Sequence, residues 1–90
     1  MTYQITDYSF HQAKLLNVEI KPSTNKKKKI DVFKDGQKIA SIGAVGYNDF
    51  PTYISEKGLD YAYERRRLYR IRHKNDLNSI NGYYANKILW

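Results

Sequence analysis

Hydrophobic and polar residues alternate with a period of two along the first half of the chain. Leu16, Val18 and Ile20 form one such set, and two further β-branched runs lie on either side of Asp35-Gly36. An Asp-Gly pair between two such runs favours a β-hairpin, because a type I′ turn needs positive φ at both central residues. The pattern predicts a small antiparallel sheet of about three strands.

The second half of the chain has the spacing of helices. A long helix is predicted over Gly58–Lys74, with Tyr61, Leu68 and Ile71 on one side and most of its basic residues on another. Acidic residues near its start and cations near its end suit the helix dipole. Asn75-Asp76 is expected to end this helix.

The segments on either side of this helix are shorter. An irregular aromatic segment is expected over residues 47–53, where Pro51 is well placed for a first helical turn. A loop is expected over residues 78–82, followed by a short helix or packed tail over residues 83–90. Because that tail ends on three large apolar residues, we expect it to dock on the sheet or on a partner.

Together these patterns predict an α+β fold in a single domain over residues 1–90. The small antiparallel sheet is expected to pack against one long basic helix and a short C-terminal helix, which cover one of its faces. Residues 1–14 lie outside the pattern, and we expect a flexible or partner-bound N-terminal segment there.

The composition narrows the class of partner. The formal net charge of +7 favours an acidic partner, with nucleic acid first and an anionic protein or membrane surface second. The chain has no cysteine, which excludes thiolate chemistry and cysteine-based metal sites. No run approaches the ~20 apolar residues of a membrane span, and the first residues lack the features of a signal peptide. We therefore expect a protein that works inside a cell and away from membranes.

Arginine and tyrosine are concentrated in the predicted long helix. Guanidinium groups match phosphate oxygens and tyrosine rings stack on bases, so this helix is the main candidate for nucleic-acid binding. Four consecutive lysines in a predicted hairpin loop can follow a phosphate backbone through non-specific contacts. The predicted nucleic-acid-binding residues are Lys26, Lys27, Lys28, Lys29, Tyr63, Arg66, Arg67, Arg70 and Lys74. The alternative is a solvated surface whose arginines cover apolar groups and pair with Asp60 and Glu64.

The sequence shows no recognisable catalytic apparatus. The two histidines, His11 and His73, stand in no common pattern, and His73 is expected to have a capping or packing role. Gly43 and Gly46 lack the neighbouring lysine and hydroxyl residue of a phosphate-binding loop, so a structural turn is expected there. We therefore expect no enzyme, no metal site and no cofactor.

Three short motifs follow one another within residues 30–90. They are Gly-x-x-Gly-Tyr-x-Asp from Gly43, Arg-x-x-Tyr-x-x-Arg-His from Arg66, and Gly-Tyr-Tyr-Ala…Leu-Trp from Gly82. Their succession resembles a family of short uncharacterised proteins of large double-stranded DNA viruses that infect algae and protists. The chain departs from that pattern at Phe50, where a tyrosine is common. The resemblance implies a viral origin and no particular activity.

The residues that carry this resemblance form a second candidate cluster. They are Tyr47, Asp49, Arg65, Tyr69, Arg72, His73 and Trp90. Asp49 could pair with an arginine of the helix, and Trp90 could pack over Tyr69. A cluster that holds the fold and a cluster that forms a binding site are therefore both open.

The preferred function is that of a small basic viral protein that binds nucleic acid, without catalysis and without sequence preference, through the Arg/Tyr-rich helix and the lysine loop. The alternative is a structural or protein-interaction module, such as a minor virion component that binds another viral or host protein. Either role would be exerted in the host cytoplasm or nucleus, or in the virion. The sequence leaves DNA versus RNA and the oligomeric state open.

Overall fold

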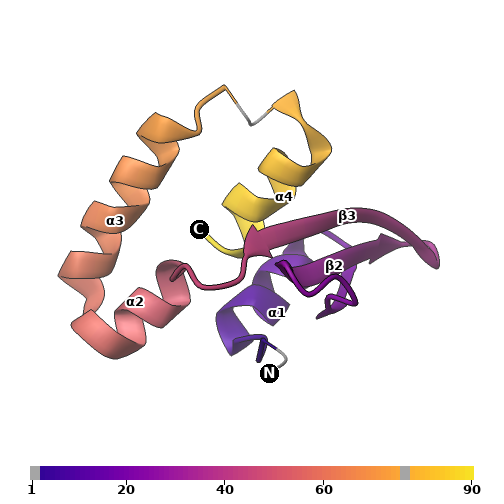
Figure 1. The fold of residues 1–90 in the computed structure, drawn as a ribbon, viewed down its shortest axis with the longest axis horizontal. Coiled ribbons are helices and arrows are strands. Elements are labelled where there is room, and N and C mark those ends of the chain that lie inside the picture. Colours follow the sequence, from indigo (N-terminus) through magenta and orange to yellow (C-terminus); the bar gives the residue numbers. More distant parts are fainter. Residues whose placement is uncertain (1–2, 76–77) are drawn as a thin grey trace.

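The computed structural model describes residues 3–75 and 78–90, and over these residues the chain has an α+β fold (Figure 1). A single antiparallel sheet has the strand order β1-β2-β3, which confirms the predicted fold class. The elements in chain order are α1 (Asp7–Leu15), β1 (Glu19–Pro22), β2 (Lys28–Lys34), β3 (Gln37–Ala44), α2 (Phe50–Lys57), α3 (Leu59–Arg72) and α4 (Ile80–Ile88).

The β2–β3 hairpin forms as its sequence predicts. Asp35 and Gly36 have φ values of 53° and 80°, and these positive values are what a type I′ turn requires. Ile30 and Val32 of β2 are fully buried, and Ile42 of β3 is 1% exposed. The period-two pattern therefore places the apolar face of the hairpin in the core.

Three of the helices begin at residues whose side chains accept a hydrogen bond from the first turn. Thr6 caps α1, Asp49 caps α2 by accepting from the Thr52 N–H, and Ser79 caps α4 by accepting from the Gly82 N–H. The prediction of a loop over residues 78–82 is therefore wrong, because Ser79 is the N-cap of α4. The segment predicted as irregular over residues 47–53 likewise contains the start of α2.

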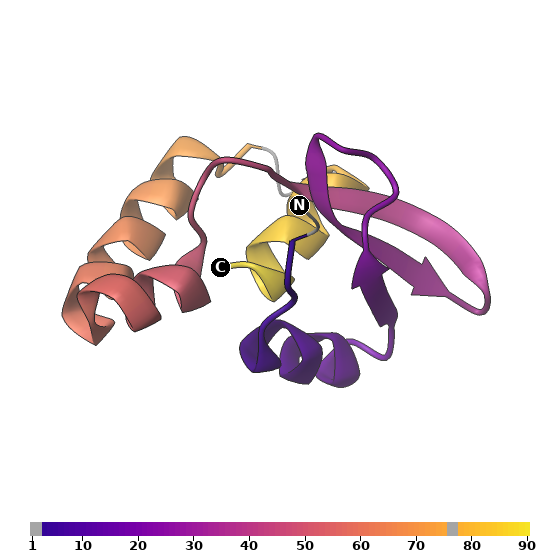
Figure 2. The same cartoon turned by 60° about the horizontal axis from the view of Figure 1, so that its bottom comes forward.

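The sequence pattern predicted no element for the N-terminal segment, but residues 7–15 form α1. This helix is fastened to the C-terminal segment, since the Ser9 hydroxyl donates to the Ile88 carbonyl at 2.9 Å. The Gln12 side-chain amide donates to the Lys87 carbonyl, also at 2.9 Å. Figure 2 shows α1 along one side of the molecule, next to α4 and the sheet.

The long basic helix does not cover the sheet as predicted. The helices that pack on the sheet are α4, on β3, and α1, on β1, whereas α3 packs against α2. Gly58, with φ of 92°, reverses the chain between α2 and α3, so that the two helices form a separate pair beside the sheet (Figures 1 and 2). The helix ends at Arg72, with His73 as its C-cap, while Asp76 lies outside the described residues.

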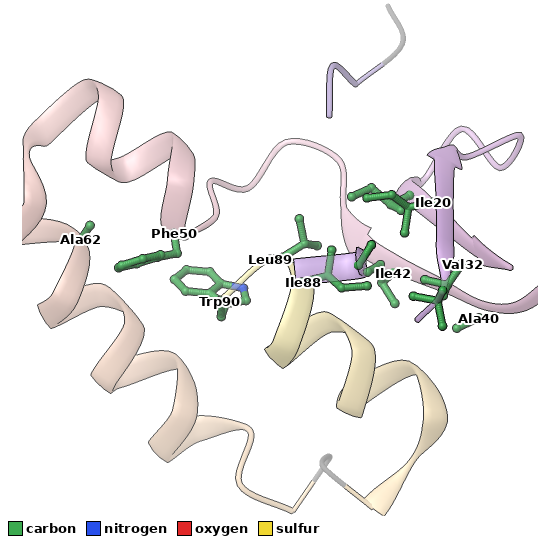
Figure 3. Packing of buried hydrophobic residues seen from close by; sticks show 12 residues of the cluster. Ile20, Val32, Ala40, Ile42, Phe50, Ala62, Ile88, Leu89 and Trp90 are labelled. Carbon is green, nitrogen blue, oxygen red and sulfur yellow. The ribbon is translucent and has the colours of Figure 1, made fainter. Parts of the chain in front are cut away.

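The C-terminal residues connect this helix pair to the sheet. Ile88 and Leu89 pack against the buried face of the strands, and Trp90 lies between them and Phe50 of α2 (Figure 3). Trp90 is 9% exposed. The predicted packed tail is therefore part of the core of this chain, and it is the bridge by which α2 and α3 are attached.

Candidate functional site

The motif residues meet around one cavity. It has a volume of about 610 Å³ and lies between the end of β3, α3 and the two ends of α4. Its walls include every residue of the predicted motif cluster, namely Tyr47, Asp49, Arg65, Tyr69, Arg72, His73 and Trp90. Residues that are more than forty positions apart in the sequence thus form one site, which we call the β3–α3 cavity.

A buried ion pair forms the base of this cavity. The Lys29 ammonium lies 3.0 Å from Asp49 Oδ2, and the two side chains are 6% and 1% exposed. Lys29 also donates to the Tyr47 carbonyl. The Asp49 carboxylate additionally accepts from the Tyr3 hydroxyl at 2.6 Å and from the Thr52 N–H at 3.1 Å. The pairing of Asp49 with an arginine of the helix was therefore a wrong prediction, because Lys29 occupies that position.

These contacts shift the pKa values of Asp49 and Tyr3, which share a hydrogen bond. Burial alone would raise the pKa of Asp49, but the donors Thr52, Tyr3 and Lys29 outweigh it and lower that pKa below its ordinary value. Burial and the neighbouring carboxylate raise the pKa of the Tyr3 hydroxyl. Asp49 is therefore ionised and Tyr3 neutral at physiological pH, so this group acts as a structural anchor.

An aromatic stack forms another wall of the cavity. The rings of Tyr69 and Trp90 have centroids 4.3 Å apart and an angle of 11° between their planes. The His73 ring lies 4.4 Å from the Tyr69 ring on α3, and the His73 N–H donates to the Tyr69 carbonyl. The structure confirms that Trp90 packs over Tyr69 and that His73 has a capping and packing role.

Three further cations line the same cavity, and none of them pairs with a carboxylate among residues 3–75 and 78–90. Lys28, Arg65 and Arg72 are among the residues that line it. Asp49 is the carboxylate among the described lining residues, and it is already paired with Lys29. The Arg65 Nε–H is buried and has no hydrogen-bond partner among the described residues. Among the described residues, the lining therefore carries more positive than negative charge, which favours an anionic ligand.

The lysines predicted to bind nucleic acid have different environments. Lys26 and Lys27 are exposed in the turn before β2, and Lys28 is half-buried at the cavity. Lys29 is 5% exposed and holds Asp49, so it cannot contact a phosphate without breaking that ion pair. Strand alternation explains the difference, because successive residues of β2 point to opposite faces.

The predicted residues of α3 lie on the flank away from the cavity. The Arg66 guanidinium lies 3.9 Å from the centre of the Phe50 ring, and exposed Arg67 pairs with Glu64. Arg70 donates to the Asn86 side chain at 3.2 Å. Tyr63 and Lys74 are exposed, and the Tyr63 ring lies 5.6 Å from that of Phe50. This side of α3 is cationic, but Arg66 already contacts Phe50 and Arg70 already contacts Asn86.

Tyr53 is among the cavity residues that were not predicted from the sequence. Tyr53 lines the cavity, and the Arg65 guanidinium lies 5.6 Å above its ring. The Tyr53 N–H donates to the carbonyl of Asp49, which is one helical turn before it. Recognising Asp49 as a helix cap would therefore have placed Tyr53 next to the motif residues.

The comparisons with known proteins match a part of this chain. Residues 18–53 match a protein family described as "Family of unknown function (DUF5754)". This stretch is less than half of the chain and includes the sheet, Lys29, Asp49 and Tyr53, but not α3 or α4. Neither the curated proteins nor the solved structures contain a match. The viral resemblance and the activity therefore stay predictions.

The described residues show neither a membrane-spanning helix nor a cluster of metal ligands. None of the helices within residues 3–75 and 78–90 is both long and apolar enough to cross a membrane. In the same residues, no group of three or more His, Cys, Asp or Glu side chains is placed to hold a metal ion.

Proposed function

We propose that this chain is a non-enzymatic protein that binds the phosphate backbone of nucleic acid. The charge balance of the β3–α3 cavity is the observation that supports this best. Lys28, Arg65 and Arg72 face one opening, while the one carboxylate described there is paired with Lys29. Arginine in particular binds phosphate oxygens with two parallel hydrogen bonds.

The surrounding surface extends this basic site. Lys26 and Lys27 are exposed next to Lys28, and Lys74 is exposed beyond the end of α3. Lysine and arginine contacts to phosphates carry no sequence information, so the binding would be independent of sequence and would weaken with salt. Together with the resemblance described above, this leads us to propose a viral genome or its transcripts as the natural partner.

The test is the binding of a labelled mixed-sequence strand, single and double, over a salt series. We expect Arg65→Gln/Arg72→Gln to weaken binding to all sequences alike and to reduce the slope of log K against log salt by about two. Lys14→Gln/Lys34→Gln is a matched control, since it removes the same charge from exposed lysines outside the cavity. Absence of binding at low salt, or equal losses in both variants, would contradict the proposal.

A second candidate is a structural or protein-interaction module, such as a minor virion component. Leu59, Leu68 and Ile71 of α3 are 48%, 41% and 56% exposed, and apolar residues on a helix surface are suited to an interface. The buried Trp90 no longer supports this candidate, because it packs within its own chain. Sedimentation equilibrium tests it: an oligomer that Leu68→Gln/Ile71→Gln dissociates would favour the module, and a monomer that binds nucleic acid would favour the first function.

A further inference from the structure

The β3–α3 cavity has a suitable size and two further features that would contact different parts of one ligand. Its volume of about 610 Å³ is within the range of small-molecule sites, which is ~300–1,000 Å³. A bare inorganic anion would leave most of that space unfilled. The occupant is therefore expected to be larger than a phosphate ion and to carry groups beyond the charge.

The first feature is a group of three cations, Arg65, Arg72 and Lys28. Arg65 lines the cavity, and its Nε–H is buried without a hydrogen-bond partner among the described residues. Arg72 and Lys28 line the same cavity, so an anionic group next to Arg65 would contact more than one cation.

The second feature is aromatic. Tyr47 is 75% exposed at the edge of the cavity, and its main chain is held in place because its carbonyl accepts from buried Lys29. Tyr53 and Trp90 also line the cavity. A planar ring that enters the cavity can therefore stack on Tyr47 at the entrance while its anionic group is bound further in.

We propose that the β3–α3 cavity binds a nucleoside monophosphate unit, with its phosphate on Arg65, Arg72 and Lys28 and its base on Tyr47. The unit is either a free nucleotide or one unstacked nucleotide of a strand, since both present the same chemistry. This inference rests on the proposed function only if the ligand is a nucleotide of a strand. It assigns the base a binding site, whereas the proposed function concerns the phosphate backbone.

The test is a titration of the whole chain with adenosine monophosphate, adenosine and inorganic phosphate as separate probes. Calorimetry gives the affinity, and Trp90, the one tryptophan of the chain, reports binding by its fluorescence because it lines the cavity. We expect adenosine monophosphate to bind more tightly than either of its two parts. Arg65→Gln should weaken that binding by at least about tenfold, the effect of one charge-assisted hydrogen bond.

Two further variants make the result specific. Arg72→Gln changes an exposed residue of the cavity and provides the same test if Arg65→Gln disturbs the fold. Arg67→Gln removes an equal charge from the face of α3 outside the cavity and should leave the affinity unchanged. Equal losses in Arg67→Gln and Arg65→Gln would overturn the proposal, and so would a phosphate affinity equal to that of adenosine monophosphate.

An oligoadenylate distinguishes the two sources. If the strand displaces adenosine monophosphate, the site takes a nucleotide of a strand; if it does not, the ligand is a free nucleotide. Strand binding with no response to adenosine monophosphate up to ~10 mM would overturn the cavity proposal and leave the proposed function standing. Binding of adenosine monophosphate without any strand binding would support the cavity proposal and reject the proposed function.

Discussion

Gly43 lies where β3 meets the C-terminal segment. Its φ is 80°, and a Cβ added there would lie 2.7 Å from Leu89 Cδ1 and 3.0 Å from Lys29 Cδ. Gly36 has the same φ of 80°, but an added Cβ would meet nothing within 4 Å. Both sites are strained for other residues, and Gly43 has in addition no room for a side chain.

A comparison of substitutions at Gly43 and Gly36 separates the cost of backbone strain from the cost of crowding. We expect Gly43→Ala to lower the free energy of unfolding more than Gly36→Ala does, by the ~1–3 kcal/mol typical of overpacking. Urea unfolding monitored by circular dichroism measures both values. Equal losses in the two variants would show that Leu89 and Lys29 move aside without cost.

Lys29 was predicted as a phosphate contact, yet the structure gives it a role in the fold. Lys29→Met should lower the free energy of unfolding by about 3–5 kcal/mol, because it leaves the buried Asp49 carboxylate without its cation. The hydrogen bonds from Tyr3 and Thr52 to Asp49 favour the lower end of that range. Chemical unfolding of Lys28→Met, the half-buried neighbour, is the control and should differ little from the wild type. Similar stability of the two variants would contradict the structural role.

Some residue contacts were predictable and others were not. The Tyr69–Trp90 stack was predicted because large aromatic groups of one helix and one apolar tail must find a common core. The partner of Asp49 was not, since the chain has sixteen lysines and arginines and charge alone does not select among them. Strand alternation was the usable signal, because Lys29 precedes the buried Ile30 and so lies on the other face of β2.

At the level of elements, α3 packs against α2 and meets the C-terminal segment through Tyr69. Tyr69 stacks on Trp90, and Arg66 lies over Phe50. Tyr69→Ala should therefore lower the free energy of unfolding by more than the ~0.5–1.5 kcal/mol of an aromatic pair, because burial of the ring is lost as well. Leu68→Ala, one position away and 41% exposed, should change it by about 0.5 kcal/mol or less. Thermal unfolding measures both, and a large effect of Leu68→Ala would mean that this face is covered in solution.

The elements themselves were predictable where local signals were strong. The Asp-Gly turn identified the hairpin, whereas α2 and the start of α4 were missed although Asp49 and Ser79 are typical N-cap residues. The orientation of α3 was predicted wrongly. Its apolar side was expected to be buried, but Leu68 and Ile71 are exposed, and Ala62 with Tyr69 forms the inner face. A helix with arginines around most of its circumference has no clear apolar stripe to orient it.

For the whole molecule, the α+β class followed from the periodicity, while the arrangement of layers did not. The sheet is covered by α1 and α4, so the helix pair α2–α3 is attached mainly through the C-terminal residues. The β3–α3 cavity exists because of this arrangement, since a helix packed flat on the sheet would have filled the space. Its walls come from segments that only the tertiary structure brings together, so its charge balance could not be read from the sequence.

Two buried carboxylates connect the stability of the whole molecule to pH. Asp31 and Asp49 are 2% and 1% exposed, and both have a pKa below the ordinary value. Burial alone would raise each pKa, but hydrogen bonds outweigh it, from the Ser23 and Ser41 hydroxyls to Asp31 and from the Thr52 side chain and the Tyr3 hydroxyl to Asp49. The folded state therefore binds fewer protons than the unfolded state in acid.

The sign of the effect follows from that difference. The stabilisation from these carboxylates is complete above the unfolded pKa of about 3.9 and is lost as pH falls through their lower folded pKa values. We expect urea midpoints to fall steeply below about pH 4. Asp49→Asn should be less stable at neutral pH and should lose less stability between pH 5 and 2.5, because one of the two linked groups is gone. Repulsion among the chain's many cations acts on both proteins alike, so parallel acid profiles would show that Asp49 is not linked to folding.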